Sequence, residues 1–319
     1  DKPTGRKIHS KTTVLNGGII FFFLILIWLI VVFNLEILNL NKFVEENYIL
    51  SKNDTIVIFL LLTGSGLVGL LADFDRLKPL SRIFLQLIIL AFFYFFLDSK
   101  FILDRLISSI LPDITINYGK VYFTILCIIL LVHAFNLMDG INGLASSVSL
   151  TWCIFLMFRI SFEFSYILLL LIMTSITLLI FFIFNIKGKC FLGDSGNYII
   201  SSIVSISSIF IYNSQISQIN YINIEFFFLL FMLPGIDMAR LFIQRIINKK
   251  NPLIGDKDHF HHMLYMYFKS HIKVCLIYVL FIICLQIAFY YFETYSILIL
   301  LIGLLSYLSL IYYKKKVKL

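Results

Sequence analysis

The sequence predicts an all-α protein built as a polytopic bundle of about ten transmembrane helices. Of its 319 residues, 60% are hydrophobic and 14% are charged, and the apolar residues form continuous runs. Soluble domains average about 25% charged residues, so this composition excludes that class. Strands of a membrane β-barrel would alternate apolar and polar residues, whereas unbroken apolar runs in lipid are expected to be helices, which satisfy their own backbone hydrogen bonds.

Ten apolar segments approach the length of about 20 residues that a bilayer-spanning helix needs. No internal repeat, low-complexity linker or compositional boundary divides them, so we expect a single domain over residues 1–319. The chain begins at Asp1 rather than Met, which leaves room for one further span upstream. The segments cover residues 17–35, 55–72, 83–97, 120–138, 145–160, 164–185, 197–213, 223–241, 273–291 and 294–313.

Lysine and arginine are distributed unequally between the two sets of loops that ten alternating spans create. The set that includes residues 1–17 holds 20 of the 26 Lys and Arg residues. Because positive charge is retained on the cytoplasmic side of membranes, both ends of this chain are predicted to be cytoplasmic. The net charge of +8 therefore reflects membrane topology, and no nucleic-acid partner is expected.

The polar clusters that suggest chemistry all fall on this predicted cytoplasmic side. They lie within residues 1–18, 72–82, 136–143, 187–196 and 256–262. Carboxylates, glycines and histidines gathered at one membrane face indicate an enzyme that works there. The first alternative is a transporter, which would place acids near mid-span and interrupt helices in paired halves. Neither pattern is visible in the sequence.

The central cluster carries Asn136, Asp139 and Asn142, spaced three residues apart and therefore near one face of a helix. Gly140 and Gly143 allow the backbone to turn or a ligand to approach closely. A carboxylate at the centre of a membrane helix costs about 2.5–3.5 kcal/mol. One placed where a span emerges is therefore a functional candidate.

The cluster before the apolar run at Tyr198 places Asp194 between Gly193 and Gly196. Glycines beside an acid at a helix start would let a phosphate or a metal contact backbone and carboxylate together. The motif Gly-Asp-Ser-Gly also occurs in serine proteases, but this sequence is not the β-rich, disulfide-bearing chain in which such an enzyme carries it. The alternative is a loop turn capped by the acid.

Three further clusters have both a chemical and a structural interpretation. Asp73 ends one span and Arg82 opens the next, which interface anchoring alone could also explain. The basic segment at residues 1–18 could serve only to bind anionic lipid. Three histidines lack the i, i+4 spacing of a helical zinc pair. We therefore expect them to bind phosphate or to carry protons. The structural alternative is a solvent-exposed polar loop. These histidines are His259, His261 and His262.

In this order, the clusters resemble the bacterial polyprenyl-phosphate N-acetylhexosamine-1-phosphate transferases, relatives of phospho-N-acetylmuramoyl-pentapeptide transferase. The likeness runs from Asp1 to about Leu264. The motifs that carry it are Asp-x-Pro-x-x-Arg-Lys-x-His with a following Gly-Gly, Asn-x-x-Asp-Gly-x-Asn-Gly, Phe-x-Gly-Asp-Ser-Gly and His-x-His-His. In this chain they are Asp1, Pro3, Arg6, Lys7, His9, Gly17 and Gly18; Asn136, Asp139, Gly140, Asn142 and Gly143; Phe191 and 193–196; and His259, His261 and His262.

Two features depart from the family pattern: the loop from Asn185 to Asp194 is one residue shorter than in the family, and one acid is missing. The family carries an Asp-Asp pair before a Pro-x-x-Arg-x-x-x-Gln run, and alignment on Pro79, Arg82 and Gln86 places Ala72 and Asp73 at that pair. If the first acid takes the proton from the lipid phosphate, its absence would impair catalysis. A family member that has lost activity is therefore the second alternative.

The resemblance implies transfer of a sugar-1-phosphate from a UDP-N-acetylhexosamine-type donor to a polyprenyl phosphate such as undecaprenyl phosphate, with release of UMP. It implies a multi-pass protein of the bacterial inner (plasma) membrane that starts a lipid-linked cell-envelope glycan, for example the O-antigen of lipopolysaccharide. The cofactor would be Mg²⁺, with Mn²⁺ as the alternative, held by Asp194 and then Asp73. A homodimer is left open. The implied catalytic residues are Asp73, Asp139, Asp194, His259 and His261, and the implied substrate-binding residues are Asn136, Asn142, Asn185, Phe191, Arg82 and His262.

Overall fold

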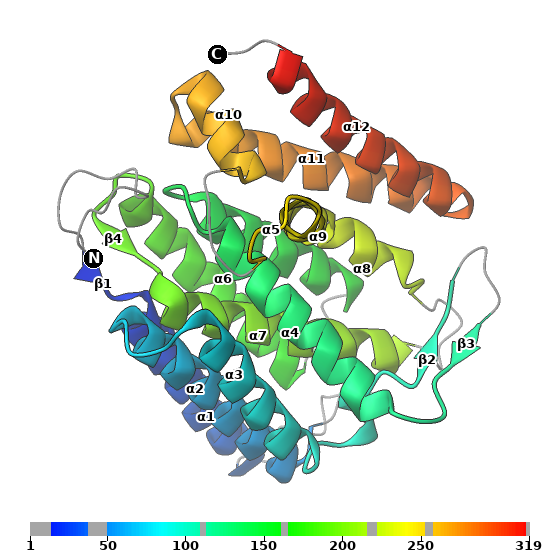
Figure 1. Cartoon of the computed structure of the whole chain (residues 1–319). Coiled ribbons are helices and arrows are strands. Elements are labelled where there is room, and N and C mark those ends of the chain that lie inside the picture. Colours follow the sequence, from blue (N-terminus) through cyan, green and yellow to red (C-terminus); the bar gives the residue numbers. More distant parts are fainter. Residues whose placement is uncertain are drawn as a thin grey trace.

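The computed structural model describes residues 14–37, 50–108, 113–160, 165–215, 222–252 and 258–316. The expected motif residues Asp1, Pro3, Arg6, Lys7 and His9 lie outside this part of the chain. The described helices pack into one bundle, with α11 and α12 along one side (Figure 1). The helices are α1 (Gly17–Ile37), α2 (Lys52–Asp73), α3 (Pro79–Tyr94), α4 (Lys120–Met138), α5 (Leu144–Arg159), α6 (Tyr166–Asn185), α7 (Gly193–Gln215), α8 (Glu225–Leu230), α9 (Met232–Ile247), α10 (Phe260–Phe268), α11 (His271–Tyr291) and α12 (Ser296–Lys316).

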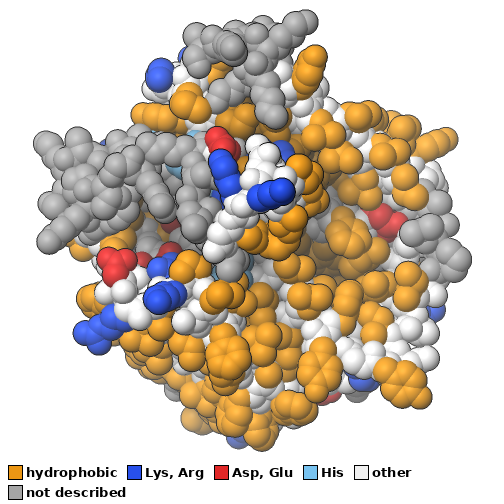
Figure 2. All heavy atoms as spheres, viewed as in Figure 1, with side chains coloured by type: hydrophobic (Ala, Val, Ile, Leu, Met, Phe, Trp, Pro, Cys, Tyr) orange, Lys and Arg blue, Asp and Glu red, His pale blue; other side chains and the backbone are white. Residues whose placement is uncertain are grey.

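The all-α, polytopic prediction is confirmed. Seven helices among the described residues are long and apolar enough to cross a membrane, and α3 and α5 are shorter apolar helices. The expected segment at 223–241 forms two helices, α8 and α9, so each of the ten expected segments coincides with helical structure. The surface seen in Figure 2 is covered largely by hydrophobic side chains, as a lipid-facing surface requires.

Helix α7 forms the centre of the bundle and packs against α1, α2, α4, α5 and α6. Its apolar span is buried along its whole length. Serines on α7 bond within the helix: the hydroxyl groups of Ser201 and Ser205 donate to the carbonyl oxygens of Asn197 and Ser201, at 2.6 and 2.7 Å. Small side chains permit close helix packing, so a polar-looking helix can occupy the core of a membrane bundle.

Glycines bring α2 against the first turn of α7. A Cβ atom on Gly69 would lie 2.5 Å from the backbone oxygen of Asp194, and one on Gly66 would lie 2.7 Å from the side chain of Ile199. Real Cβ atoms do not approach backbone atoms so closely, so this crossing requires glycine. The end of α2 and the start of α7 are thereby held together.

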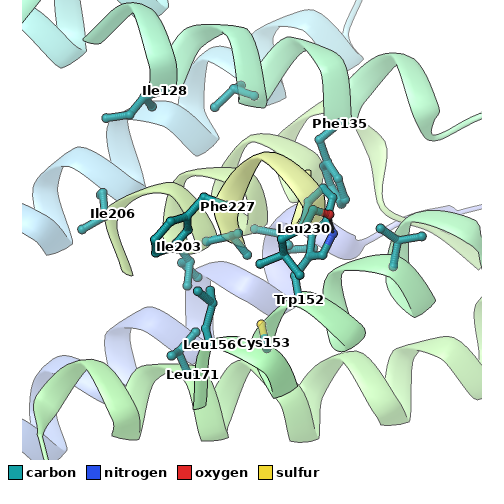
Figure 3. Packing of buried hydrophobic residues seen from close by; sticks show 14 of the residues in the cluster. Ile128, Phe135, Trp152, Cys153, Leu156, Leu171, Ile203, Ile206, Phe227 and Leu230 are labelled. Carbon is teal, nitrogen blue, oxygen red and sulfur yellow. Dashed lines mark hydrogen bonds between the residues drawn. The ribbon is translucent and has the colours of Figure 1, made fainter. Parts of the chain in front are cut away.

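The break between α8 and α9 has a local cause. Pro234 has no N–H group to donate to the carbonyl oxygen of Leu230, four residues earlier. The indole Nε1 of the buried Trp152 donates to that oxygen instead, at 2.9 Å. Figure 3 shows Trp152 beside Leu230, and its ring also packs against Phe135 and Phe231. A buried aromatic residue of α5 thus stabilises an interrupted helix.

Short strand pairs lie at the two ends of the bundle (Figure 1). Strands β1 (Val14–Leu15) and β4 (Cys190–Phe191) pair in parallel, with Val14 opposite Cys190. Strands β2 (Arg105–Leu106) and β3 (Ile114–Thr115) form an antiparallel pair. The β1–β4 pair joins the segment before α1 to the loop before α7, and Asp194 follows directly after this loop.

Candidate active site

The carboxylate of Asp73, at the end of α2, caps the first turn of α7. Its Oδ1 and Oδ2 atoms accept hydrogen bonds from the backbone N–H groups of Asp194 and Ser195, at 2.8 and 3.1 Å. The first N–H groups of a helix have no partner within it, and they carry the positive end of the helix dipole. Asp73 satisfies two of these donors, so it fixes the position of Asp194.

Asp194 is approached by donors from two other helices. Arg82, in the first turn of α3, donates from Nη1 to Oδ2 of Asp194. Asn136, near the end of α4, donates from Nδ2 to Oδ1 at 3.1 Å. Pro79 occupies the first turn of α3, a position that favours proline, and Arg82 follows three residues later. Four of the predicted site residues therefore meet directly.

Asp139 follows α4 and contacts α7 one turn beyond Asp194. Its Oδ2 atom accepts a 2.7 Å hydrogen bond from Nδ2 of Asn197. Burial raises the pKa of Asp139 to about 6, the hydrogen bond from Asn197 opposes this shift, and the nearby charges of Asp194 and Asp73 add to it. Three predicted carboxylates thus lie close enough to influence one another's charge.

The amide of Asn185 links two motifs of the site. Its Oδ1 accepts from the backbone N–H of Gly143 at 2.6 Å, and its Nδ2 donates to the carbonyl oxygen of Cys190 at 2.7 Å. Asn142 lies nearby, because a Cβ on Gly188 would be 3.2 Å from its Nδ2. Phe191 is half-buried in β4. Asn185 thus connects the motif that contains Gly143 to the loop that contains Cys190. Contacts of Asn142 and Phe191 with a substrate stay predictions.

The three histidines lie around the start of α10 and reach the central motif. The rings of His259 and His261 stack with centroids 5.4 Å apart, and those of His261 and His262 lie 4.2 Å apart. A Cβ on Gly140 would collide with Nε2 of His261, so the histidine packs directly on the Asp139–Gly140 turn. Nδ1 of His259 lies 3.0 Å from Oδ2 of Asp237.

Four polar residues of this region were not singled out in the sequence. Asn197 carries no signal beyond its place three residues after Asp194. Asp237 does carry one, because it is an acid inside the apolar segment 223–241, where ionisable groups are costly and usually functional. The other two, Arg240 and Tyr307, bond to it.

Two groups of side chains could hold a metal ion. Among the described residues, Asp237, His259 and His261 bring three possible ligand atoms within 4.8 Å of one another. Asp237 already accepts from four donors, however, which fills the acceptor capacity of a carboxylate, and nitrogen-rich groups suit zinc rather than magnesium. The carboxylates of Asp73, Asp139 and Asp194 offer the oxygen ligands that Mg²⁺ prefers. This second group has the oxygen donors that suit the cofactor that the sequence resemblance implies, and those oxygens accept hydrogen bonds from Arg82, Asn136, Asn197 and the backbone of α7.

Comparison with known proteins agrees with this geometry. Residues 55–212 match the family model described as glycosyl transferase family 4. The phospho-N-acetylmuramoyl-pentapeptide-transferase of Streptococcus sanguinis is 33% identical over 168 residues, which are 50% of this chain and 51% of that protein. The undecaprenyl-phosphate alpha-N-acetylglucosaminyl 1-phosphate transferase of Thermotoga maritima is 23% identical over 266 residues, 82% of this chain and 72% of that protein.

A third relative is the probable undecaprenyl-phosphate N-acetylglucosaminyl 1-phosphate transferase of Bacillus subtilis, 25% identical over 290 residues, 88% of this chain and 74% of that protein. The chain thus spans about half the length of the Streptococcus relative and about three quarters of the other two. The family and these names together indicate a phosphoglycosyl transferase. The matched segment contains Asp73, Asp139 and Asp194, and residues 55–212 of the chain therefore belong to glycosyl transferase family 4.

Proposed function

We propose that this protein transfers an N-acetylhexosamine-1-phosphate, or that of a related sugar, from a UDP-sugar to a polyprenyl phosphate and releases UMP. The names of its relatives support this reaction class. The observation that carries the proposal is the meeting of Asp73, Asp194, Arg82 and Asn136 at one end of the bundle, beside Asp139. Phosphate transfer needs acids for a metal and a cation for phosphate oxygens, and this site holds both.

A long apolar cavity beside the site suits a polyprenyl chain. Its volume is about 730 Å³, and it is lined by α4, α7, α8, α9 and α12. The lining on α4 runs from Phe123 to Ala134, about 16 Å along a helix axis. Ala134 lies only two residues before Asn136. An isoprenoid tail in this cavity would place its phosphate toward the end of α4 that carries Asn136 and Asp139.

The residues have distinct proposed roles. Asp194, with Asp73, would hold Mg²⁺ or Mn²⁺, which supplies screening of the pyrophosphate and stabilisation of the leaving phosphate. Arg82 would bind phosphate oxygens beside them. Asp139 and Asn136 would orient the reacting groups. The remaining predicted ligands are Phe191 against the uracil ring, Asn142 and Asn185 at the nucleotide, and His259, His261 and His262 at the phosphates.

The proposed site faces the cytoplasm of a bacterial inner membrane. The excess of Lys and Arg in the loops on this side supports that orientation. A sugar nucleotide made in the cytoplasm would reach the site directly, while the lipid phosphate would arrive at the membrane surface. The product would start a lipid-linked glycan of the cell envelope, such as O-antigen.

UMP release by the purified protein tests the proposal. The assay would supply undecaprenyl phosphate, Mg²⁺ and a panel of UDP-N-acetylhexosamines, with Asp194→Asn as the inactive control. Release that requires both the lipid and the metal, and that disappears in the control, is expected. A folded protein that releases no UMP from any donor would contradict the proposal.

A catalytically impaired protein is the second candidate, favoured by Ala72. This residue is 2% exposed, so no solvent-facing side chain replaces the absent acid. The other acid nearby, Asp75, is exposed in the turn after α2 with φ of 56° and does not occupy the position of the absent acid. UMP release that is gained only in Ala72→Asp would support impairment, whereas release by the unaltered protein would exclude it.

A further inference from the structure

We propose that Asp237 is a positioning residue that holds the imidazole of His259 in the orientation and tautomer the transferase needs. This inference rests on the proposed function. It concerns a residue on α9, outside the motifs that define the site. It also gives α12 a part in the reaction, although that helix lies beyond the segment that resembles the family.

Asp237 is surrounded by donors from three parts of the chain. Its Oδ1 accepts from Nη2 of Arg240 at 2.8 Å and from the hydroxyl of Tyr307 at 2.7 Å. The backbone N–H of Phe260 approaches both carboxylate oxygens at 3.2 Å. The carboxylate and Tyr307 are buried. A buried carboxylate with this many donors has a single orientation.

The orientation of Asp237 determines which nitrogen of His259 is free. An ionised carboxylate paired with Arg240 can only accept hydrogen bonds. Nδ1 of His259, 3.0 Å from Oδ2, must therefore carry a proton. Nε2 is left as the atom that can accept a proton and, once protonated, donate to a phosphate oxygen. A carboxylate behind a histidine commonly serves this purpose at metal and catalytic sites.

The same contact fixes the other histidines against the central motif. His259 stacks nearly parallel on His261, with an angle of 19° between the rings. His261 is 1% exposed and packs on Gly140, next to Asp139. Rotation of the His259 ring would disturb this stack. Asp237 thus acts on the site through His259 and has no direct contact with the three predicted catalytic carboxylates among the contacts described.

The arrangement of donors argues against Asp237 as a direct metal ligand. Its two oxygens accept from four donors, which fills the acceptor capacity of a carboxylate, and one of these donors is the positively charged guanidinium group of Arg240. A cation at this position would have to displace the guanidinium group. The histidines and the carboxylate are therefore better explained as an oriented imidazole than as a metal centre.

A double-mutant cycle of UMP release tests the proposal. We expect Asp237→Asn to lower kcat about 10- to 100-fold, the range typical of residues that orient a functional histidine. In the His259→Ala background, Asp237→Asn should lower kcat by less than about a further twofold, because the imidazole that Asp237 positions is absent. Tyr307→Phe, which leaves His259 intact, should reduce kcat severalfold.

A matched control separates positioning from general destabilisation. Glu225→Gln alters another buried acid of the same expected segment, on α8, where it accepts a hydrogen bond from Ser108. Its kcat should stay within about twofold of the unaltered protein. Losses from Asp237→Asn and His259→Ala that simply multiply in the double variant would overturn the proposal, as would unchanged kcat in Asp237→Asn.

A second measurement does not depend on turnover. In ¹⁵N-histidine NMR spectra of the full chain in detergent, His259 should carry a proton on Nδ1, and Asp237→Ala should shift this proton to Nε2 or mix the tautomers. Identical His259 resonances in the two proteins would contradict the proposal. If the unaltered protein releases no UMP but the NMR change occurs, the proposed function fails while the positioning contact stands.

Discussion

The carboxylate of Asp73 accepts a 2.8 Å hydrogen bond from the backbone N–H of Asp194, 121 residues further along the chain. The bond places the end of α2 on the first turn of α7. Asp73 therefore fixes the position of Asp194. Substitutions at this junction should affect folding and activity together.

Replacement of Asp73 should weaken the start of α7. We expect Asp73→Ala to lower the free energy of unfolding by about 1–2 kcal/mol, because two N–H groups lose their acceptor. UMP release should also fall at least about 100-fold as Asp194 moves. Thermal unfolding and the UMP assay measure the two effects. Asp75→Asn, at an exposed turn position, should leave both unchanged, and equal effects of the two substitutions would refute the capping role.

The crossing of α2 and α7 should tolerate no side chain at Gly69. A Cβ there would lie 2.5 Å from backbone atoms of Asp194 and Ser195, so Gly69→Ala should destabilise the protein by about 1–3 kcal/mol. A Cβ on Gly235, in α9, would have no atom within 4 Å, and Gly235→Ala should be neutral or stabilising by up to about 1 kcal/mol. Thermal unfolding of both variants in detergent provides the comparison. A similar loss in each would show that helix propensity, rather than the crossing, governs the effect.

Magnesium should stabilise the protein through the carboxylates. A cation that binds only the folded state at 100 times its Kd adds about 2.7 kcal/mol, which is measurable as a rise in Tm. We expect Asp194→Asn to abolish the rise and Asp237→Asn to retain it. The reverse pattern would place the metal at the histidines. Tm is measured after removal of metal with EDTA and again after addition of Mg²⁺.

Asp139 should make stability depend on pH in the absence of metal. Its pKa is about 6 in the folded protein, against 3.8 for an ordinary Asp. Between these values the folded state holds a proton that the unfolded state has lost, so stability should fall as pH rises from about 4 to about 6, by at most about 3 kcal/mol. Asp139→Asn should make this slope shallower. Asp98→Asn, at an exposed carboxylate, should leave the slope intact, and Tm against pH in EDTA measures both.

Much of the architecture follows from local composition. Each of the ten apolar segments coincides with helical structure, because lipid leaves the backbone of such a run few alternatives. Helix α3 begins at Pro79, four residues before the expected segment 83–97, at a position that proline favours. The break at Phe231 was not expected, although Pro234 is its local cause.

Chain order and residue type were enough to predict an all-helical membrane protein with acids, amides and histidines gathered at one face. They could not show which of these residues touch, because contacts such as Asp73 with Asp194 or Asp139 with Asn197 join segments far apart in sequence. Nor could they connect Tyr307 with Asp237 and His259, since that contact depends on where α12 packs. Helix formation is a local property set by hydrophobicity, whereas the partner of each polar side chain is set by how the helices cross.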